Sequence, residues 1–143
     1  MASEPFVLEE RPVHLGLSAT VVVEPPFTGG AWYADYIERH AADGAEGRLV
    51  SIHSFDRPWD SWEMHPHGEE LVVCLSGELT LFQELDSAQQ GGAPSVGGAL
   101  RSVTLRPGQA IVNPRGVWHT ADVSTPSSAL FITAGLGTEQ RPR

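Results

Sequence analysis

Short runs of apolar residues separated by turn-forming residues make up most of the chain from position 48 onward. We expect a strand at each run, because alternating or β-branched apolar residues between glycine, proline, asparagine or aspartate are typical of β-structure. The expected strands are Leu49–Phe55, Ser61–Met64, Leu71–Leu75, Leu79–Glu84, Leu100–Leu105, Ala110–Val112, Trp118–Val123 and Ala129–Thr133. Their regular spacing predicts an all-β sandwich or barrel.

The first 46 residues have a different pattern. Residues 1–12 are polar and contain prolines, which predicts an extended arm, and the β-branched run Ser18–Val23 predicts a strand within Val13–Glu24. Apolar residues then recur at helical spacing from Ala31 to Ala42, where we expect the one short helix of the chain. One side of this helix carries three apolar residues, Trp32, Tyr36 and Ile37.

These patterns divide the chain into three parts. We expect residues 1–46 to form an arm, strand and helix that pack on a barrel, residues 47–135 to form the barrel, and residues 136–143 to be a frayed tail. The segment Asp86–Gly98, rich in glycine and glutamine, predicts a flexible hairpin loop. A chain of 143 residues is long enough for one domain with a core of its own.

Composition narrows the range of partners. The formal charge is −9, with nine arginines, no lysine and eighteen acidic residues, so we expect neither nucleic acid nor an anionic membrane as a partner. The single cysteine, Cys74, cannot form an internal disulfide. The first residues lack the pattern of a signal peptide, and no apolar run approaches the ~20 residues of a membrane span, so we expect a soluble cytoplasmic protein.

The segment Pro107–Thr120 combines two turns with the short apolar strand between them, and His119 follows the second turn directly. Because side chains alternate along a strand, His119 shares its face with Val117, Ala121 and Val123. We therefore expect this histidine to enter a largely apolar interior, which is the pattern of a ligand pocket.

A second group of polar residues precedes the strand Leu71–Leu75. Glu63, His65 and His67 are two positions apart, so the same alternation predicts that they point inward together. Large apolar residues would then point outward, namely Trp62, Met64 and Trp118. An outward set of this kind suggests cover by the helix, the arm or a second subunit, and we expect a homodimer.

These two segments resemble the motifs of the cupins, a family of small double-stranded β-helix (jelly-roll) barrels. The second cupin motif is complete here, although Val123 stands where the family has a trailing asparagine; its residues are Gly108, Pro114, Gly116 and His119. The first motif is approximated, with Trp59 in place of the leading glycine and a shorter gap before the glutamate. Its residues here are His65, His67, Glu70 and Gly77. The resemblance covers about residues 47–135.

The resemblance implies an all-β double-stranded β-helix barrel with one short N-terminal helix. It also implies four metal ligands, which are His65, His67, Glu70 and His119. Nitrogen and oxygen donors of this kind suit Fe, Mn, Ni, Zn or Cu and do not select among them. Glu69 could replace Glu70 if the strand register slipped by one residue, but it would then need to use the opposite face.

Three functions agree with these features. The first is a metal-dependent enzyme that oxidises, isomerises or cleaves a small organic molecule, with Glu63 as the acid–base residue. The second is a non-catalytic module that binds or senses a small molecule without a functional metal, in which case the buried histidines and Glu70 would bond one another. The third is an interaction protein. The other histidines are weaker candidates for a functional site. We expect His53 to be structural, and His14 and His40 to have no neighbours of interest.

Overall fold

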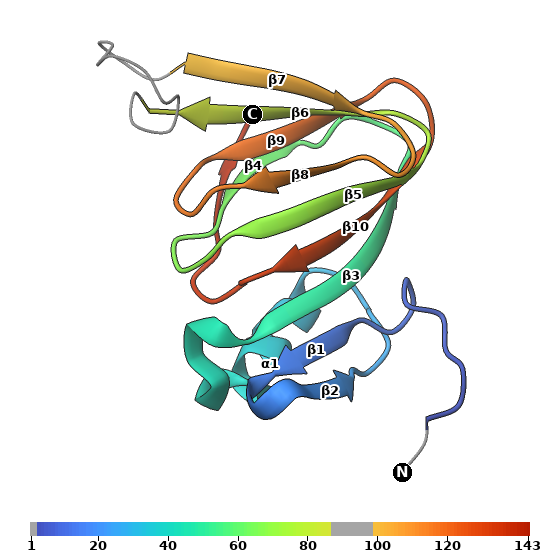
Figure 1. The fold of residues 1–143 in the computed structure, drawn as a ribbon, viewed down its shortest axis with the longest axis vertical. Coiled ribbons are helices and arrows are strands. Elements are labelled where there is room, and N and C mark those ends of the chain that lie inside the picture. Colours follow the sequence, from blue (N-terminus) through green and yellow to red (C-terminus); the bar gives the residue numbers. More distant parts are fainter. Residues whose placement is uncertain (1–2, 87–98) are drawn as a thin grey trace.

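The computed structural model describes residues 3–86 and 99–143, and the described part is an all-β barrel with one short α-helix. Its strands are β1 (Val13–Gly16), β2 (Thr20–Val23), β3 (Arg48–Phe55), β4 (Ser61–Met64), β5 (Glu70–Ser76), β6 (Leu79–Leu85), β7 (Ala99–Leu105), β8 (Ala110–Asn113), β9 (His119–Val123), β10 (Ser127–Thr133) and β11 (Glu139–Pro142). They form a six-stranded sheet, β2-β1-β3-β10-β5-β8, and a five-stranded sheet, β11-β4-β9-β6-β7 (Figure 1). All pairings are antiparallel, and the two sheets make a jelly-roll barrel, which confirms the expected fold class.

All eight strands expected from position 48 onward are present, and each end lies within two residues of its expected place. The N-terminal run differs, because Val13–Glu24 forms a hairpin of β1 and β2 rather than one strand. A single 3₁₀ turn, Leu17–Ala19, joins the two strands. The expected helix is α1 (Ala31–Arg39), followed by a second 3₁₀ segment, Ala41–Glu46.

The core of the barrel lies between the two sheets. Its residues come from β5, β6, β7, β9 and β10, and the most deeply buried are Val72, Cys74, Leu79, Leu81 and Ala121. A second, smaller cluster joins the helix to the barrel, because Trp32 and Tyr36 of α1 pack against Leu49 of β3. The helical spacing of the sequence therefore predicted the side of α1 that is buried.

The segment from position 136 onward is ordered, so the expectation of a frayed tail was wrong. Strand β11 pairs with β4 over four residues, from Glu139 opposite Met64 to Pro142 opposite Ser61. The guanidinium of Arg141 lies over the rings of Trp62 and Trp118, with its carbon 5.2 and 4.5 Å from their centroids. Part of the outward aromatic set is thus covered within one chain, and the homodimer stays a prediction.

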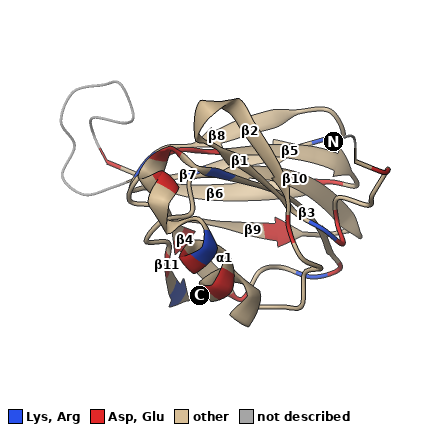
Figure 2. Ribbon diagram, turned by 90° about the horizontal axis from the view of Figure 1, so that it is seen from below, with Lys and Arg blue, Asp and Glu red and all other residues tan. Residues whose placement is uncertain are grey.

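The remaining expectations concern charge and the long loop. Acidic and basic segments are interspersed over the strands and helix in Figure 2. None of the helices in residues 3–86 and 99–143 is long and apolar enough to cross a membrane. The expected loop Asp86–Gly98 falls, except for Asp86, outside the described residues.

Candidate metal centre

Two rows of neighbouring residues, one on each sheet, form a polar layer inside the barrel. On the six-stranded sheet the neighbours in register are Thr133 of β10, Glu70 of β5 and Asn113 of β8. On the five-stranded sheet they are Glu63 of β4, His119 of β9 and Gln83 of β6. Alternation places the next inward residues, such as Val72 and Ala121, in the apolar core. The polar layer therefore borders the apolar core.

His65 reaches this layer from the turn that follows β4. The turn packs tightly against the end of β10, because a Cβ atom on Gly68 would lie only 2.3 Å from the Cβ of Ala134. The turn before β9 contains Gly116 at φ +74°, a left-handed conformation that favours glycine. Its N–H donates to the carbonyl oxygen of His65 at 2.9 Å. The two turns thus hold each other, and they bring His65 and His119 together.

The side chains of His65, His119 and Glu70 converge at one point. Nε2 of His65 lies 3.2 Å from Oε2 of Glu70, and Nε2 of His119 lies 3.3 Å from Oε1 of the same carboxylate. The two imidazole rings are 5.1 Å apart and inclined by 39°. A ligand atom of Glu63 lies within 4.8 Å of one on each histidine. All three converging residues are at most 4 % exposed.

Hydrogen bonds on the far side of each ring define which nitrogen carries hydrogen. Nδ1 of His119 faces the carbonyl oxygen of Val117 at 3.3 Å, and a carbonyl only accepts, so Nδ1 is the donor. Nδ1 of His65 lies 2.8 Å from Oγ1 of Thr138, whose hydroxyl already donates to the carbonyl of Gly135. That oxygen therefore accepts from His65. In both neutral rings the free lone pair is on Nε2.

When both rings are neutral, these two lone pairs face the carboxylate of Glu70, and neither side has a hydrogen to donate to the other. Within the described part of the chain, neither Nε2 atom of His65 or His119 has a hydrogen-bond partner, although both are buried. Acceptors that face one another at about 3 Å repel unless a proton or a metal cation lies between them. A divalent transition metal satisfies this requirement, and two imidazoles with carboxylates are a donor set that such metals accept. The residues present therefore fit a metal ion.

The carboxylate of Glu70 is itself held in place. Nδ2 of Asn113 donates to Oε1 at 3.0 Å, and the hydroxyl of Thr133 donates to Oε2 at 2.6 Å. The amide of Gln83 in turn donates to Oδ1 of Asn113 at 2.8 Å. Supporting bonds of this kind orient ligands and tune the affinity of metal sites.

The charges of the centre shift its pKa values in different directions. Burial alone would raise the pKa of Glu70, but the imidazoles of His119 and His65 hold it well below the usual value. Burial likewise opposes protonation of His119, yet Glu70 and then Glu63 raise the pKa of this imidazole. Burial and the nearby charge of Glu70 raise the pKa of Glu63. Glu63 is thus the carboxylate of the pair that takes up a proton more readily.

The structure does not bring His67 to this centre. Strand β4 ends at Met64, so the alternation that was expected to turn His67 inward does not extend to it, and its side chain is exposed in the turn. Glu69 is also exposed, whereas Glu70 is 3 % exposed and faces inward, so no register slip occurs.

Two aromatic residues lie near the centre, and one of them, Tyr33, gave no signal in the sequence. The hydroxyl of Tyr33 on α1 lies 3.2 Å from Nε2 of His53 on β3. Burial, followed by the charges of Glu63 and Glu70, raises the pKa of Tyr33 to about 12. Burial lowers the pKa of His53, which suits the structural role expected for it. Trp59 lies beside the ring of His119, and its buried indole nitrogen has no partner among the described residues.

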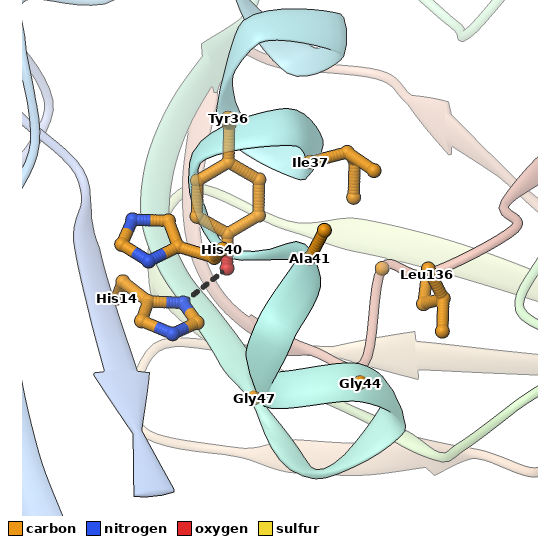
Figure 3. Close-up of a pocket in the computed structure, with 9 residues that line it drawn as sticks. His14, Tyr36, Ile37, His40, Ala41, Gly44, Gly47 and Leu136 are labelled. Atoms are coloured by element: carbon orange, nitrogen blue, oxygen red, sulfur yellow. Dashed lines mark hydrogen bonds between the residues drawn. The ribbon is translucent and has the colours of Figure 1, made fainter.

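A second group of titratable residues occupies the N-terminal part, contrary to the expectation that His14 and His40 have no neighbours of interest. The group, which we call the N-terminal cluster, comprises His14, Glu24, Tyr36, Arg39, His40 and Asp43. His14 bonds the hydroxyl of Tyr36 at 2.6 Å and the carboxylate of Asp43 at 2.7 Å. His40 bonds Glu24, which also accepts two bonds from Arg39. The cluster borders a small hollow of about 20 Å³, room for roughly one water molecule (Figure 3).

Comparisons with known proteins found solved structures that resemble part of this chain. No protein-family model matches the sequence, and no curated protein matches it. A hydroquinone 1,2-dioxygenase from Sphingomonas sp. TTNP3, with 4-hydroxybenzoate bound, is 15% identical over 60% of this chain and 59% of its own, with a TM-score of 0.48. An oxalate oxidase is 21% identical over 64% of this chain and 43% of its own, with a TM-score of 0.42. The chain thus covers 59% of the dioxygenase chain and 43% of the oxalate oxidase chain. Likeness at this level carries no argument about a reaction.

Proposed function

We propose that this barrel binds one divalent transition-metal ion and acts on a small organic molecule at that ion. His65, His119 and Glu70 would hold the ion, with Glu63 beside them. The observation that supports the proposal is the pair of buried Nε2 lone pairs, without hydrogen-bond partners among the described residues, that face one carboxylate. Fe, Mn, Ni, Zn and Cu all remain compatible with these donors.

Among the reactions compatible with this donor set, we propose oxidation. Two histidines and one carboxylate on one side of an ion are typical of non-haem iron oxygenases, in which open positions admit the reactants. When bound, the ion would supply a Lewis acid and a site for a small-molecule ligand. Glu63, with its raised pKa, would accept or release a proton beside that ligand. Gln140 donates to Glu63 at 3.1 Å and would orient its carboxylate.

One observation favours a second candidate, a module in which the metal is structural. His119 is completely buried, as a ligand of a structural metal would be. The two functions differ in their response to His119→Ala. An enzyme should lose turnover and keep its fold, whereas a protein with a structural metal should also lose stability.

Metal analysis of protein purified without a histidine tag or a nickel column tests the proposal. We expect about one ion per chain after loading with Fe, Mn or Zn and removal of the excess. Fewer than about 0.2 ions per chain, after loading of each metal in turn, would contradict it and favour the metal-free binding module. Turnover of small organic acids and phenols under air, with and without the loaded ion, then distinguishes an enzyme from a metal-binding module.

A further inference from the structure

The segment from Thr138 to Arg143, which we call the closing segment, contacts the candidate centre at two points. Oγ1 of Thr138 accepts the hydrogen bond from Nδ1 of His65 at 2.8 Å. Two residues along, Gln140 pairs with Glu63 in register, and its amide donates to Oε1 of that glutamate. The closing segment therefore touches both residues that β4 and its turn supply to the centre.

The position of His65 depends on the bond to Thr138 more than the positions of Glu70 and His119 depend on any single hydrogen bond. Glu70 and His119 belong to strands with neighbours on both sides, and further bonds fix their side chains. His65 lies outside any strand, and Thr138 provides the one hydrogen bond to its ring within the described residues. Because the Thr138 hydroxyl donates to Gly135 and accepts from Nδ1, it selects the tautomer whose Nε2 lone pair faces Glu70.

Arginines attach the closing segment to the barrel. Arg141 pairs with Glu84 of β6 and lies over two tryptophan rings. Arg143 pairs with Asp122 of β9 at 2.7 Å and donates to the carbonyl oxygens of Trp59 and Ala121. Together with the pairing of β11 and β4, these contacts hold the closing segment against β4, β6 and β9.

We propose that the closing segment positions the metal centre, with Thr138 as a positioning residue for His65 and Gln140 as one for Glu63. This inference rests on the proposed function, because it assigns the segment to the same centre. Loosening of the segment would free the ring of His65 to rotate or change tautomer, and the affinity for metal would fall while the barrel remained folded.

The experiment compares three variants of the full chain by competition for Zn²⁺ with a chelator. Thr138→Val keeps the shape and removes the hydroxyl, and we expect it to lower the affinity about 10–100-fold, the range for groups that orient a ligand. Thr138→Ser keeps the hydroxyl and should restore affinity to within about threefold of the original chain. Thr80→Val is the matched control, because it removes a hydroxyl that bonds Thr104 between β6 and β7, and it should leave the affinity unchanged.

A second measurement on metal-free protein separates this inference from the proposed function. The ¹⁵N shifts of the His65 ring should show hydrogen on Nδ1 in the original chain and a mixture of tautomers in Thr138→Val. If the original chain binds no Zn²⁺ but this change of tautomer is seen, the metal proposal fails and the positioning role stands. If Thr138→Val binds Zn²⁺ as tightly as the original chain, or leaves the tautomer unchanged, the inference is wrong.

Discussion

The barrel centre and the N-terminal cluster contain the same kinds of residues in different bonding states. Each has two imidazoles and at least one carboxylate with ligand atoms within 4.8 Å of one another. In the N-terminal cluster both nitrogens of His14 are bonded, and His40 is bonded to the buried Glu24. In the barrel centre the inward nitrogens of both histidines are without hydrogen-bond partners among the described residues. Proximity alone therefore does not distinguish a metal site from a hydrogen-bonded network.

The arrangement of the rings separates the two groups further. Two imidazoles bound to one ion at about 2.1 Å hold their ring centroids about 5 Å apart, because both rings point at the ion. The rings of His65 and His119 are 5.1 Å apart and tilted. Those of His14 and His40 are stacked, 3.7 Å apart with 16° between their planes. Stacked rings have parallel lone pairs that do not converge, which favours the barrel centre over the N-terminal cluster as a metal site.

The largest expected effect is the loss of metal on removal of a barrel histidine. His119→Ala should lower the affinity for Zn²⁺ by more than about 100-fold, beyond the range seen for residues that only orient ligands. His40→Ala is the matched control, and its metal content should equal that of the original chain. Chelator competition measures both. Loss of metal from His40→Ala with retention by His119→Ala would reverse the assignment of the two groups.

The next effect is on pH, because a proton and a metal compete for Nε2 of His119. The pKa of His119 is raised above 6.5, so its interaction with Glu70 stabilises the metal-free fold below about pH 6.5 and is lost as the pH rises through the raised pKa. The pKa of Glu70 is lowered from 4.5, so its contribution is present above about pH 4.5 and is lost as the pH falls towards the lowered pKa.

Metal affinity should therefore rise about tenfold per pH unit until His119 has lost its proton. The rise of the melting temperature caused by Zn²⁺, measured at several pH values between about 5 and 8, reports it. The same series with Glu70→Gln removes the charge that holds the proton, and its pH dependence should be shallower. An affinity that does not change with pH would show that His119 is not a ligand.

A smaller loss of metal affinity is expected when the hydrogen bond from Asn113 to Glu70 is removed. Asn113→Ala deletes the amide that donates to Oε1 and should lower metal affinity about 10–100-fold through misorientation of the carboxylate. Gln109→Ala is the control, because its amide oxygen accepts one bond from Arg106 in an exposed turn. Equal affinities of the two variants would show that the hydrogen bonds from Gln83 to Asn113 and from Asn113 to Glu70 do not affect metal binding.

The sequence predicted the barrel because its strands have apolar residues at alternating positions, and each such run is a strand in the structure. Strand β11 was missed for the opposite reason. The residues Glu139–Pro142 contain no apolar side chain besides that of Pro142, and the strand depends on pairing with β4 and on the contact of Arg141 with distant tryptophans. Such contacts join residues far apart in the chain, so no local pattern reports them.

The site was predictable where the motif coincides with a strand and was missed elsewhere. His119 and Glu70 lie at the first positions of β9 and β5, where alternation defines the inward face. His67 was placed inward because alternation was extended beyond the end of β4. The residues of the N-terminal cluster come from β1, from the position after β2, from α1 and the residue after it, and from the following 3₁₀ segment. Residues so dispersed have no characteristic spacing.

Stability rather than metal binding should respond to a change in the N-terminal cluster. Tyr36→Phe removes the hydroxyl that bonds the buried ring of His14, and we expect the free energy of unfolding to fall by about 1–3 kcal/mol. The loss should be the same with and without Zn²⁺, as measured by urea unfolding. Tyr33→Phe is the matched control, because Tyr33 is 39% exposed and should cost less. A change of metal affinity in Tyr36→Phe would link the two groups that the comparison separates.

The smallest expected effect is that of His67→Ala, and it tests the one ligand of the resemblance that lies outside the centre. The side chain of His67 is exposed in the turn and contributes nothing to the converging group, so metal affinity should change by less than about twofold, as for other surface substitutions. His65→Ala, two residues away in the same turn, is the comparison and should lose most of its metal. A loss of more than about tenfold in His67→Ala would mean that the turn rearranges when the ion binds and brings His67 to it. The centre would then have three imidazoles and one carboxylate, as the resemblance implies, and the close contact of Gly68 with Ala134 would have to open.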